Sequence, residues 1–177
     1  MASDLYNQIV SQRGSLERLV ARIPGFRGYQ DKTARRTADS MLRDYIAAQI
    51  QQRIDRLVRI EKLILDTLGT ANLSQTRDVK ANIQLFHDKI RTAAPGYTGM
   101  WSQMKIGPEE LDKLYAFDEA QIVYVDKIDL ALDRLQEAVI NREGVEAAIF
   151  NLNEVVAEAI AAYDLRQDVL TDLSSRI

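Results

Sequence analysis

Apolar residues recur every three or four positions along most of this chain, a spacing that predicts amphipathic α-helices. The first helix is expected to begin after Ser3, a good N-terminal cap, and to run to about Arg22. Pro24 and Gly25 follow at once and are expected to end it. Its apolar stripe comprises Leu5, Ile9, Leu16, Leu19, Val20 and Ile23.

The second helix is expected to be unusually long. It starts near Gln30 or Asp31 and meets no helix-breaking residue before Leu68. At about 1.5 Å per residue it would span roughly 55 to 60 Å, about twice the length of an ordinary globular helix. Gly69 supplies a natural C-terminal stop.

Three further helices are expected. Asn72 with Gln75 resembles a capping box and opens a third helix that runs to about Ala93. A loop over residues 95–107 follows it. The fourth helix should cover residues 108–140, and the fifth should cover 142–173.

The fourth and fifth helices share one heptad register. The turn between them is short, so they should lie antiparallel. When the chain is folded back near residue 142, their apolar positions match: Val139 with Val145, Leu135 with Ile149, Leu132 with Leu152, Ile128 with Val156, Val125 with Ala159, Leu114 with Leu170, and Leu111 with Leu173. The polar exceptions also fall opposite one another, with Gln121 facing Tyr163 and Asp118 facing Arg166.

These elements predict an all-α fold: an elongated helical bundle of about five helices, forming a single domain over residues 1–177. The chain has no cysteine, which excludes disulfides, thiolate metal sites and cysteine nucleophiles and favours a cytoplasmic location. The start, Met-Ala-Ser-Asp, does not resemble a signal peptide. No stretch approaches the roughly 18 consecutive apolar residues of a transmembrane segment, so none is expected.

Charge is distributed unevenly along the chain. Residues 1–107 hold 17 Lys and Arg against 10 Asp and Glu, whereas residues 108–177 hold 6 against 16. One interpretation is that basic helices pack beside acidic ones within the same bundle. The other is a dipolar surface whose two faces meet different partners, or neighbouring copies of the chain.

The polar layer of the last two helices is the first candidate site; it comprises Asp118, Gln121, Tyr163 and Arg166. A carboxylate at a seam position is costly unless a cation or hydrogen-bond donors satisfy it, and Arg166 is placed to do so. The layer is therefore interpreted either as a buried ion pair that fixes the register or as a polar pocket for a small ligand.

A loop rich in glycine and basic residues is the second candidate site. It contains Ile23–Tyr29, and its basic residues, with those of the following helix, are Arg27, Lys32, Arg35 and Arg36. Backbone amides, a helix N-terminus and four cations could bind an anion. Alternatively, the glycines permit a tight turn that aromatic residues anchor to the bundle. A similar pattern at residues 95–100 is interpreted as recurrent turn chemistry or as a trace of duplication.

Signals for chemistry or nucleic-acid binding are weak. His87 is the only histidine, and we interpret it as a surface or boundary residue. Asp126, Asp129 and Asp133 have the spacing of an exposed acidic helix face. No catalytic residue, metal site or cofactor is predicted, and no nucleic-acid motif is present. Peripheral membrane contact is not expected either, because acidic residues interrupt the basic half.

Two short segments resemble a group of uncharacterised prokaryotic helical proteins. Ile23–Tyr29 (IPGFRGY) precedes an Arg-rich helix, as in that group, and Leu114–Asp118 (LYAFD) matches its later Leu-Tyr-x-Phe-Asp segment. The resemblance implies a shared helical fold and adds interest to Arg35, Arg36 and Asp118. It implies no activity, because none is known to us for the group.

The sequence therefore favours a non-enzymatic interaction or scaffold protein. It would bind a protein partner or associate with itself through the part of the second helix that extends beyond its shorter neighbours. The alternative is a small-ligand or anion-binding protein that uses either the Arg-rich segment 23–36 or the polar layer.

Overall fold

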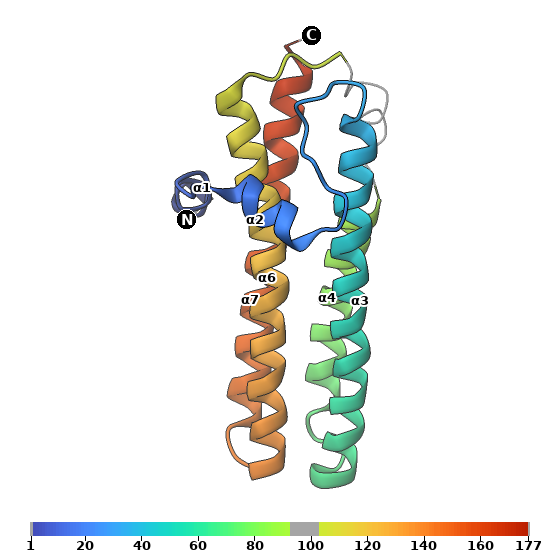
Figure 1. Ribbon diagram of the computed structural model, residues 1–177. Coiled ribbons are helices and arrows are strands. Elements are labelled where there is room, and N and C mark those ends of the chain that lie inside the picture. Colours follow the sequence, from blue (N-terminus) through green and yellow to red (C-terminus); the bar gives the residue numbers. More distant parts are fainter. Residues whose placement is uncertain (1, 93–102, 177) are drawn as a thin grey trace.

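The computed structural model describes residues 2–92 and 103–176, which form six helices and no strand (Figure 1). The all-helical prediction is confirmed, with six helices in these residues where about five were expected. The helices are α1 (Ala2–Val10), α2 (Ser15–Arg22), α3 (Arg35–Leu68), α4 (Leu73–Arg91), α6 (Pro108–Asn141) and α7 (Val145–Ser174). Residues 95–100, with their recurrent loop pattern, lie outside the described residues.

Four helices form the bundle, in the spatial order α3, α4, α7, α6 around its axis. α3 and α4 form one antiparallel hairpin, and α6 and α7 form a second beside it (Figure 1). The two hairpins point the same way, so α4 runs parallel to α7. α3 and α6 are each 34 residues long, and Arg56 of α3 reaches Asp129 and Asp133 of α6 well along both helices. α3 is therefore accompanied by another long helix and has no projecting part of the kind expected for self-association.

The first predicted helix is in fact two. Gly14 has a φ of 71°, a left-handed conformation that interrupts a right-handed helix. The two halves then pack separately: α1 lies against α6 and α7, and α2 lies against α6 (Figure 1). The apolar positions keep one helical spacing across the break, which is why the periodicity alone did not reveal it.

Other helix boundaries also differ from those expected. α3 begins at Arg35 rather than near residue 31, because a carboxylate oxygen of Asp31 accepts hydrogen bonds from the amide and hydroxyl of Thr33 and holds a turn there. α7 begins at Val145, after Gly144 in a left-handed conformation. At the start of α4, Asn72 contacts the Gln75 side chain instead of forming a capping box with the backbone.

Ion pairs join the basic N-terminal half to the acidic C-terminal half of the chain. Arg22 of α2 pairs with Asp126, and Arg56 of α3 pairs with Asp129 and Asp133. The charge asymmetry therefore reflects ion pairs between helices of the same bundle. Asp126, Asp129 and Asp133 are each paired with an arginine and do not form an acidic face contacted by solvent alone. None of the helices in the described part of the chain is both long enough and apolar enough to cross a membrane.

Candidate functional site

Arg166 of α7 is the centre of a buried charge network at the end of the bundle where α3 begins and α7 ends. Its Nε lies 2.5 Å from Oδ1 of Asp118 on α6, and its Nη2 lies 2.8 Å from Oδ1 of Asp39 on α3. All three residues are buried. Arg43, one turn along α3, pairs with the other oxygen of Asp39 at 2.8 Å. The network therefore balances two guanidinium groups against two carboxylates.

Tyr29 ties the loop before α3 into this network. Its hydroxyl donates a 2.6 Å hydrogen bond to Asp118, and its ring stacks on Tyr115 at 5.5 Å between centroids. The hydroxyl of Tyr115 in turn accepts a hydrogen bond from the backbone amide of Tyr29. Gly28 makes this approach possible, since a Cβ there would lie only 2.5 Å from the Tyr115 hydroxyl oxygen. The two segments that carry the sequence resemblance, 23–29 and 114–118, thus pack directly against each other.

Burial and charge act in opposite directions within the network. Burial raises the pKa of the Asp118 carboxyl, although Arg166 and Tyr29 lower it. Burial and the charge of Asp118 together raise the pKa of Tyr29 well above its ordinary value. Burial disfavours the charged form of Arg166, but the two carboxylates outweigh that effect, and the pKa of Arg166 is raised. The guanidinium is therefore held in its charged form.

Gln121 and Tyr163, the other two residues of the predicted polar layer, make no hydrogen bond to Asp118 or Arg166 among the described contacts. Gln121 is buried, and its amide nitrogen donates to the carbonyl of Phe117 in its own helix. Its Oε1 has no hydrogen-bond partner among the described residues. Tyr163 is also buried, and burial raises its pKa. No hydrogen bond joins Gln121 to Tyr163, so the centre of the buried network is Asp39, Asp118, Arg166 and Tyr29 rather than the predicted layer of four.

The sequence analysis missed Asp39 and Tyr29 as partners of Arg166. A signal for Asp39 was present, because it precedes Leu42 by three residues and Ile46 by seven and so continues the buried stripe of α3. A carboxylate on the buried face of a helix must be paired with a cation or accept hydrogen bonds. Tyr29 offered no comparable signal, since it lies in a loop without periodicity.

The four basic residues proposed for an anion site do not converge on one place. Arg35 is buried, and its guanidinium donates to the carbonyls of Tyr29 and Met104 at 2.7 and 2.9 Å. Arg27, Lys32 and Arg36 are exposed. Arg35 is thus committed to holding the loop before α3 against the segment before α6.

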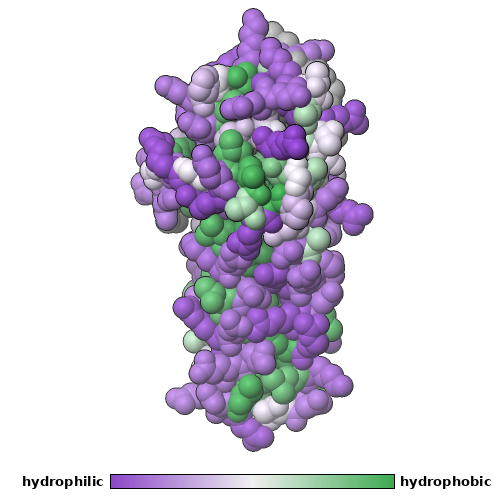
Figure 2. Space-filling model, in the orientation of Figure 1, coloured by the Kyte–Doolittle hydropathy of each residue, from purple (hydrophilic) through white to green (hydrophobic). Residues whose placement is uncertain are grey.

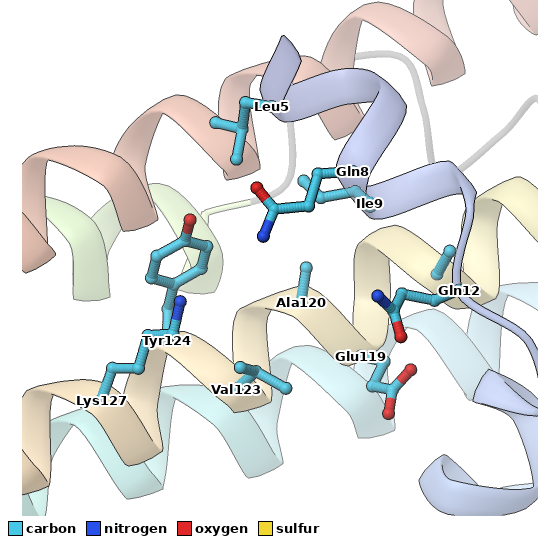
Figure 3. A pocket seen from close by; sticks show the side chains of 10 residues that line it. Leu5, Gln8, Ile9, Gln12, Glu119, Ala120, Val123, Tyr124 and Lys127 are labelled. Atoms are coloured by element: carbon cyan, nitrogen blue, oxygen red, sulfur yellow. The ribbon is translucent and has the colours of Figure 1, made fainter.

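A groove runs over α6 between α1 and α2, and we call it the α6 groove. On one side, a cavity of about 160 Å³ separates α1 from α6 (Figure 3). On the other, a mostly apolar cavity of about 290 Å³ separates α2 from α6. Val123 and Glu119 line both cavities, so α6 forms the floor and the two short helices form the walls. The α1 side is lined by Leu5, Gln8, Ile9, Gln12, Ala116, Glu119, Ala120, Val123, Tyr124 and Lys127.

Large apolar side chains are exposed on α2 and α6, and one of them, Val123, lines the groove. Val20 of α2 is 48 % exposed, Val123 is 41 % exposed, and Leu130, seven residues further along α6, is 58 % exposed. A spacing of seven residues puts Val123 and Leu130 on one face of α6. Figure 2 shows apolar patches among the charged side chains on the face of the bundle that carries α2, α3 and α6.

Charged groups beside the α6 groove are already paired within the chain. Glu119 accepts hydrogen bonds from Arg18 and from Ser15, and Asp126 makes a bidentate pair with Arg22. Lys127 lies over the ring of Tyr124, 4.7 Å from its centroid. The groove therefore offers apolar area with little unbalanced charge.

His87 is partly buried and contacts its neighbour Asp88. Among the described residues, no group of three or more His, Asp and Glu side chains could hold a metal ion. Comparison of the chain with known family models, with curated proteins and with solved structures finds no match.

Proposed function

We propose that this protein is a non-enzymatic interaction or scaffold module that holds a helix of another polypeptide in the α6 groove. The observation that carries the proposal is that Val123 lines both cavities beside α6, while Val20 of α2 and Leu130 of α6 are also exposed. A floor of one helix with two helical walls is suited to an amphipathic helix, which inserts apolar side chains at turn-by-turn spacing.

Two features favour recognition by apolar burial rather than by charge. Arg18 and Arg22 are paired with α6 carboxylates, so the groove presents little free charge to a partner. Complete burial of a fully exposed Val or Leu side chain contributes about 1.5 to 3 kcal/mol of favourable free energy. Val20, Val123 and Leu130 are 41 to 58 % exposed, so a partner that covers them would gain about half of that free energy from each.

A small-ligand function has less support. In the α6 groove, the cavities of about 160 and 290 Å³ are smaller than the roughly 300 to 1,000 Å³ of typical small-molecule pockets. The buried network around Arg166 lines none of the cavities described above, and the four cations proposed for an anion site do not converge. A polypeptide partner therefore remains the better proposal.

Site-specific photocrosslinking in the native cell tests this function. A benzophenone side chain at Leu130 should give a discrete adduct, whereas the same group at Lys62, exposed on α3, should not. The substitution Val123→Asp should remove the Leu130 adduct and leave the circular dichroism melting curve unchanged. An adduct of twice the protein's mass identifies a second copy as the partner. No adduct at either Leu130 or Val20 would show the proposal to be wrong.

A further inference from the structure

A second groove lies on the opposite side of the bundle, between α4 and α7. Its cavity volume is about 510 Å³, larger than either cavity beside α6. Val79 and Ile149 contribute apolar lining, and two polar bridges join the helices: Asn82 to Asn153 at 2.9 Å and Lys89 to Asp164 at 2.8 Å. The full lining is Gln75, Asp78, Val79, Asn82, Glu146, Ala147, Ile149, Phe150 and Asn153.

Two large apolar side chains stand at the edges of this α4/α7 groove. Phe150 of α7 lines it and is 66 % exposed. Leu85 of α4 is 48 % exposed, and it lies three residues after Asn82 and four before Lys89, the two residues that reach α7. Helical spacing therefore puts Leu85 on the side of α4 that faces α7. Phe150 and Leu85 could both pack against an apolar side chain of a partner protein.

The charged residues that line this cavity, Asp78 and Glu146, are both acidic. The only cation of α7 is Arg166, which is buried and used by Asp118 and Asp39. Asp78 and Glu146 line the groove and make no ion pair with other described residues. Every exposed charged side chain of α7 is acidic: Glu146, Glu154, Glu158, Asp164, Asp168 and Asp172.

We propose that the α4/α7 groove binds a basic amphipathic helix of a partner protein. The partner's apolar face would cover Phe150 and Leu85, and its Lys or Arg residues would face Asp78 and Glu146. Charge complementarity of this kind guides encounter and register, while apolar burial supplies affinity. The proposal concerns a different face from the α6 groove and does not depend on the function proposed there.

A second copy of this chain could present Val58 and Leu65 of α3 with Arg59 and Lys62, and sedimentation of the chain as a monomer would exclude that occupant. α2 of a second copy fits less well, because its Arg18 and Arg22 are occupied by Glu119 and Asp126 of α6. Docking α2 of another copy would require both pairs to break. An anionic membrane is a still poorer occupant, because the α7 carboxylates would repel it.

Fluorescence anisotropy with a defined peptide tests the proposal. The probe is a labelled amphipathic helix of Leu and Lys, about 18 residues long, which spans about 27 Å. Its control has the same pattern of Leu and Glu. We expect the full chain to bind the Lys probe, with affinity falling as ionic strength rises, and not to bind the Glu control. Absence of binding to the Lys probe, or equal binding of the two peptides, would overturn the proposal.

Surface variants then locate the binding. Phe150→Ser should weaken binding of the Lys probe about tenfold or more. Asp78→Lys with Glu146→Lys should weaken it by a similar factor and reduce the dependence on salt. All three side chains are exposed, so the variants should retain the melting curve of the unmodified protein.

Matched controls exclude a response to bulk charge or hydrophobicity. Ile140→Ser removes a side chain that is 60 % exposed on α6, and Glu137→Lys changes a charge on α6. Both should bind the probe within about twofold of the unmodified protein. Val123→Asp, in the α6 groove, should also leave binding unchanged. If these controls lose as much affinity as the groove variants, the α4/α7 groove is not the binding site.

Discussion

Two sets of ion pairs join α3 to the C-terminal hairpin, and their difference is instructive. Asp39, near the start of α3, contacts Arg166 in a buried network that also includes Asp118. Arg56, near the middle of α3, contacts Asp129 and Asp133 at the surface. The chemical groups are the same, but only the buried set has lost its water. Its members must satisfy one another, whereas the surface set can exchange its partners for solvent.

The comparison explains why the two ends of the bundle are built differently. At the buried network, a loop, three helices and the stacked tyrosines Tyr29 and Tyr115 meet, and the structure is fixed by specific polar contacts. Further along the bundle, the seams are apolar and the charged groups are at the surface. The α6 groove lies on the outer face of α6 at the level of Asp118, and the α4/α7 groove lies further along the bundle. No residue of the network lines either groove, so a partner could occupy them without displacing it.

The largest expected effect comes from removing the cation of the buried set. Arg166→Leu leaves Asp118 buried without a guanidinium and Asp39 with Arg43 alone, and it should cost about 3 to 5 kcal/mol of unfolding free energy. Asp118→Ala should cost less, because Arg166 keeps Asp39 at 2.8 Å. Both values can be measured by urea denaturation.

The double variant Asp118→Leu with Arg166→Leu provides the matched control for this prediction. It removes both charges of the 2.5 Å pair and should recover part of the stability lost in Arg166→Leu. A double-mutant cycle gives the coupling energy between the two residues. A loss below about 1 kcal/mol for Arg166→Leu would show that the network does not stabilise the fold.

A smaller effect is expected from the hydroxyl of Tyr29. Tyr29→Phe removes the 2.6 Å hydrogen bond to Asp118 while keeping the ring stacked on Tyr115. Loss of a donor to a buried carboxylate should cost about 1.5 to 3 kcal/mol by urea denaturation. Tyr163→Phe is the control, because the Tyr163 hydroxyl makes no hydrogen bond with the described residues, and it should cost under about 0.5 kcal/mol. Equal losses in the two variants would contradict the role given to Tyr29.

The part of this arrangement that the sequence predicts is the part built from local periodicity. Two helices joined by a short turn can be aligned from their heptads, and that register puts Asp118 opposite Arg166, where the structure has them in contact. The all-helical fold follows from the same periodicity. The partners Tyr29 and Asp39 are distant in sequence, and their contacts depend on how the hairpins pack, which no spacing along the chain specifies.

The predictions from sequence are wrong where the conformation of a single residue determines the local structure. Gly14 divides the first helix through a positive φ, although the apolar spacing continues across it. Arg35 was grouped with Arg27, Lys32 and Arg36 as an anion site because composition does not reveal which side chains face inward. Its guanidinium instead binds two backbone carbonyls. The grooves were also unforeseen, since they depend on how closely neighbouring helices approach.

The smallest expected effect concerns a surface pair that fastens α2 to α6. Burial raises the pKa of Glu119, but hydrogen bonds from Arg18 and Ser15 outweigh burial and leave that pKa below its ordinary value of 4.5. A lowered pKa in the folded state means that the carboxylate stabilises the docked α2 above about pH 4.5, and that this contribution is lost as pH falls through the folded-state value. Hydrogen-exchange protection of the α2 amides should therefore decrease on acidification.

A local measurement is needed because Asp118 acts in the opposite direction. Its pKa is raised by burial, so its titration favours the folded state at low pH and would offset the loss at Glu119 in any global unfolding experiment. Glu119→Gln keeps an oxygen that can accept from Ser15 and removes the titrating group. In that variant, the fall in protection of α2 relative to α7 between pH 5 and pH 3 should be much smaller than in the unmodified protein. If protection in the variant falls as steeply as in the unmodified protein, Glu119 does not hold α2 in place.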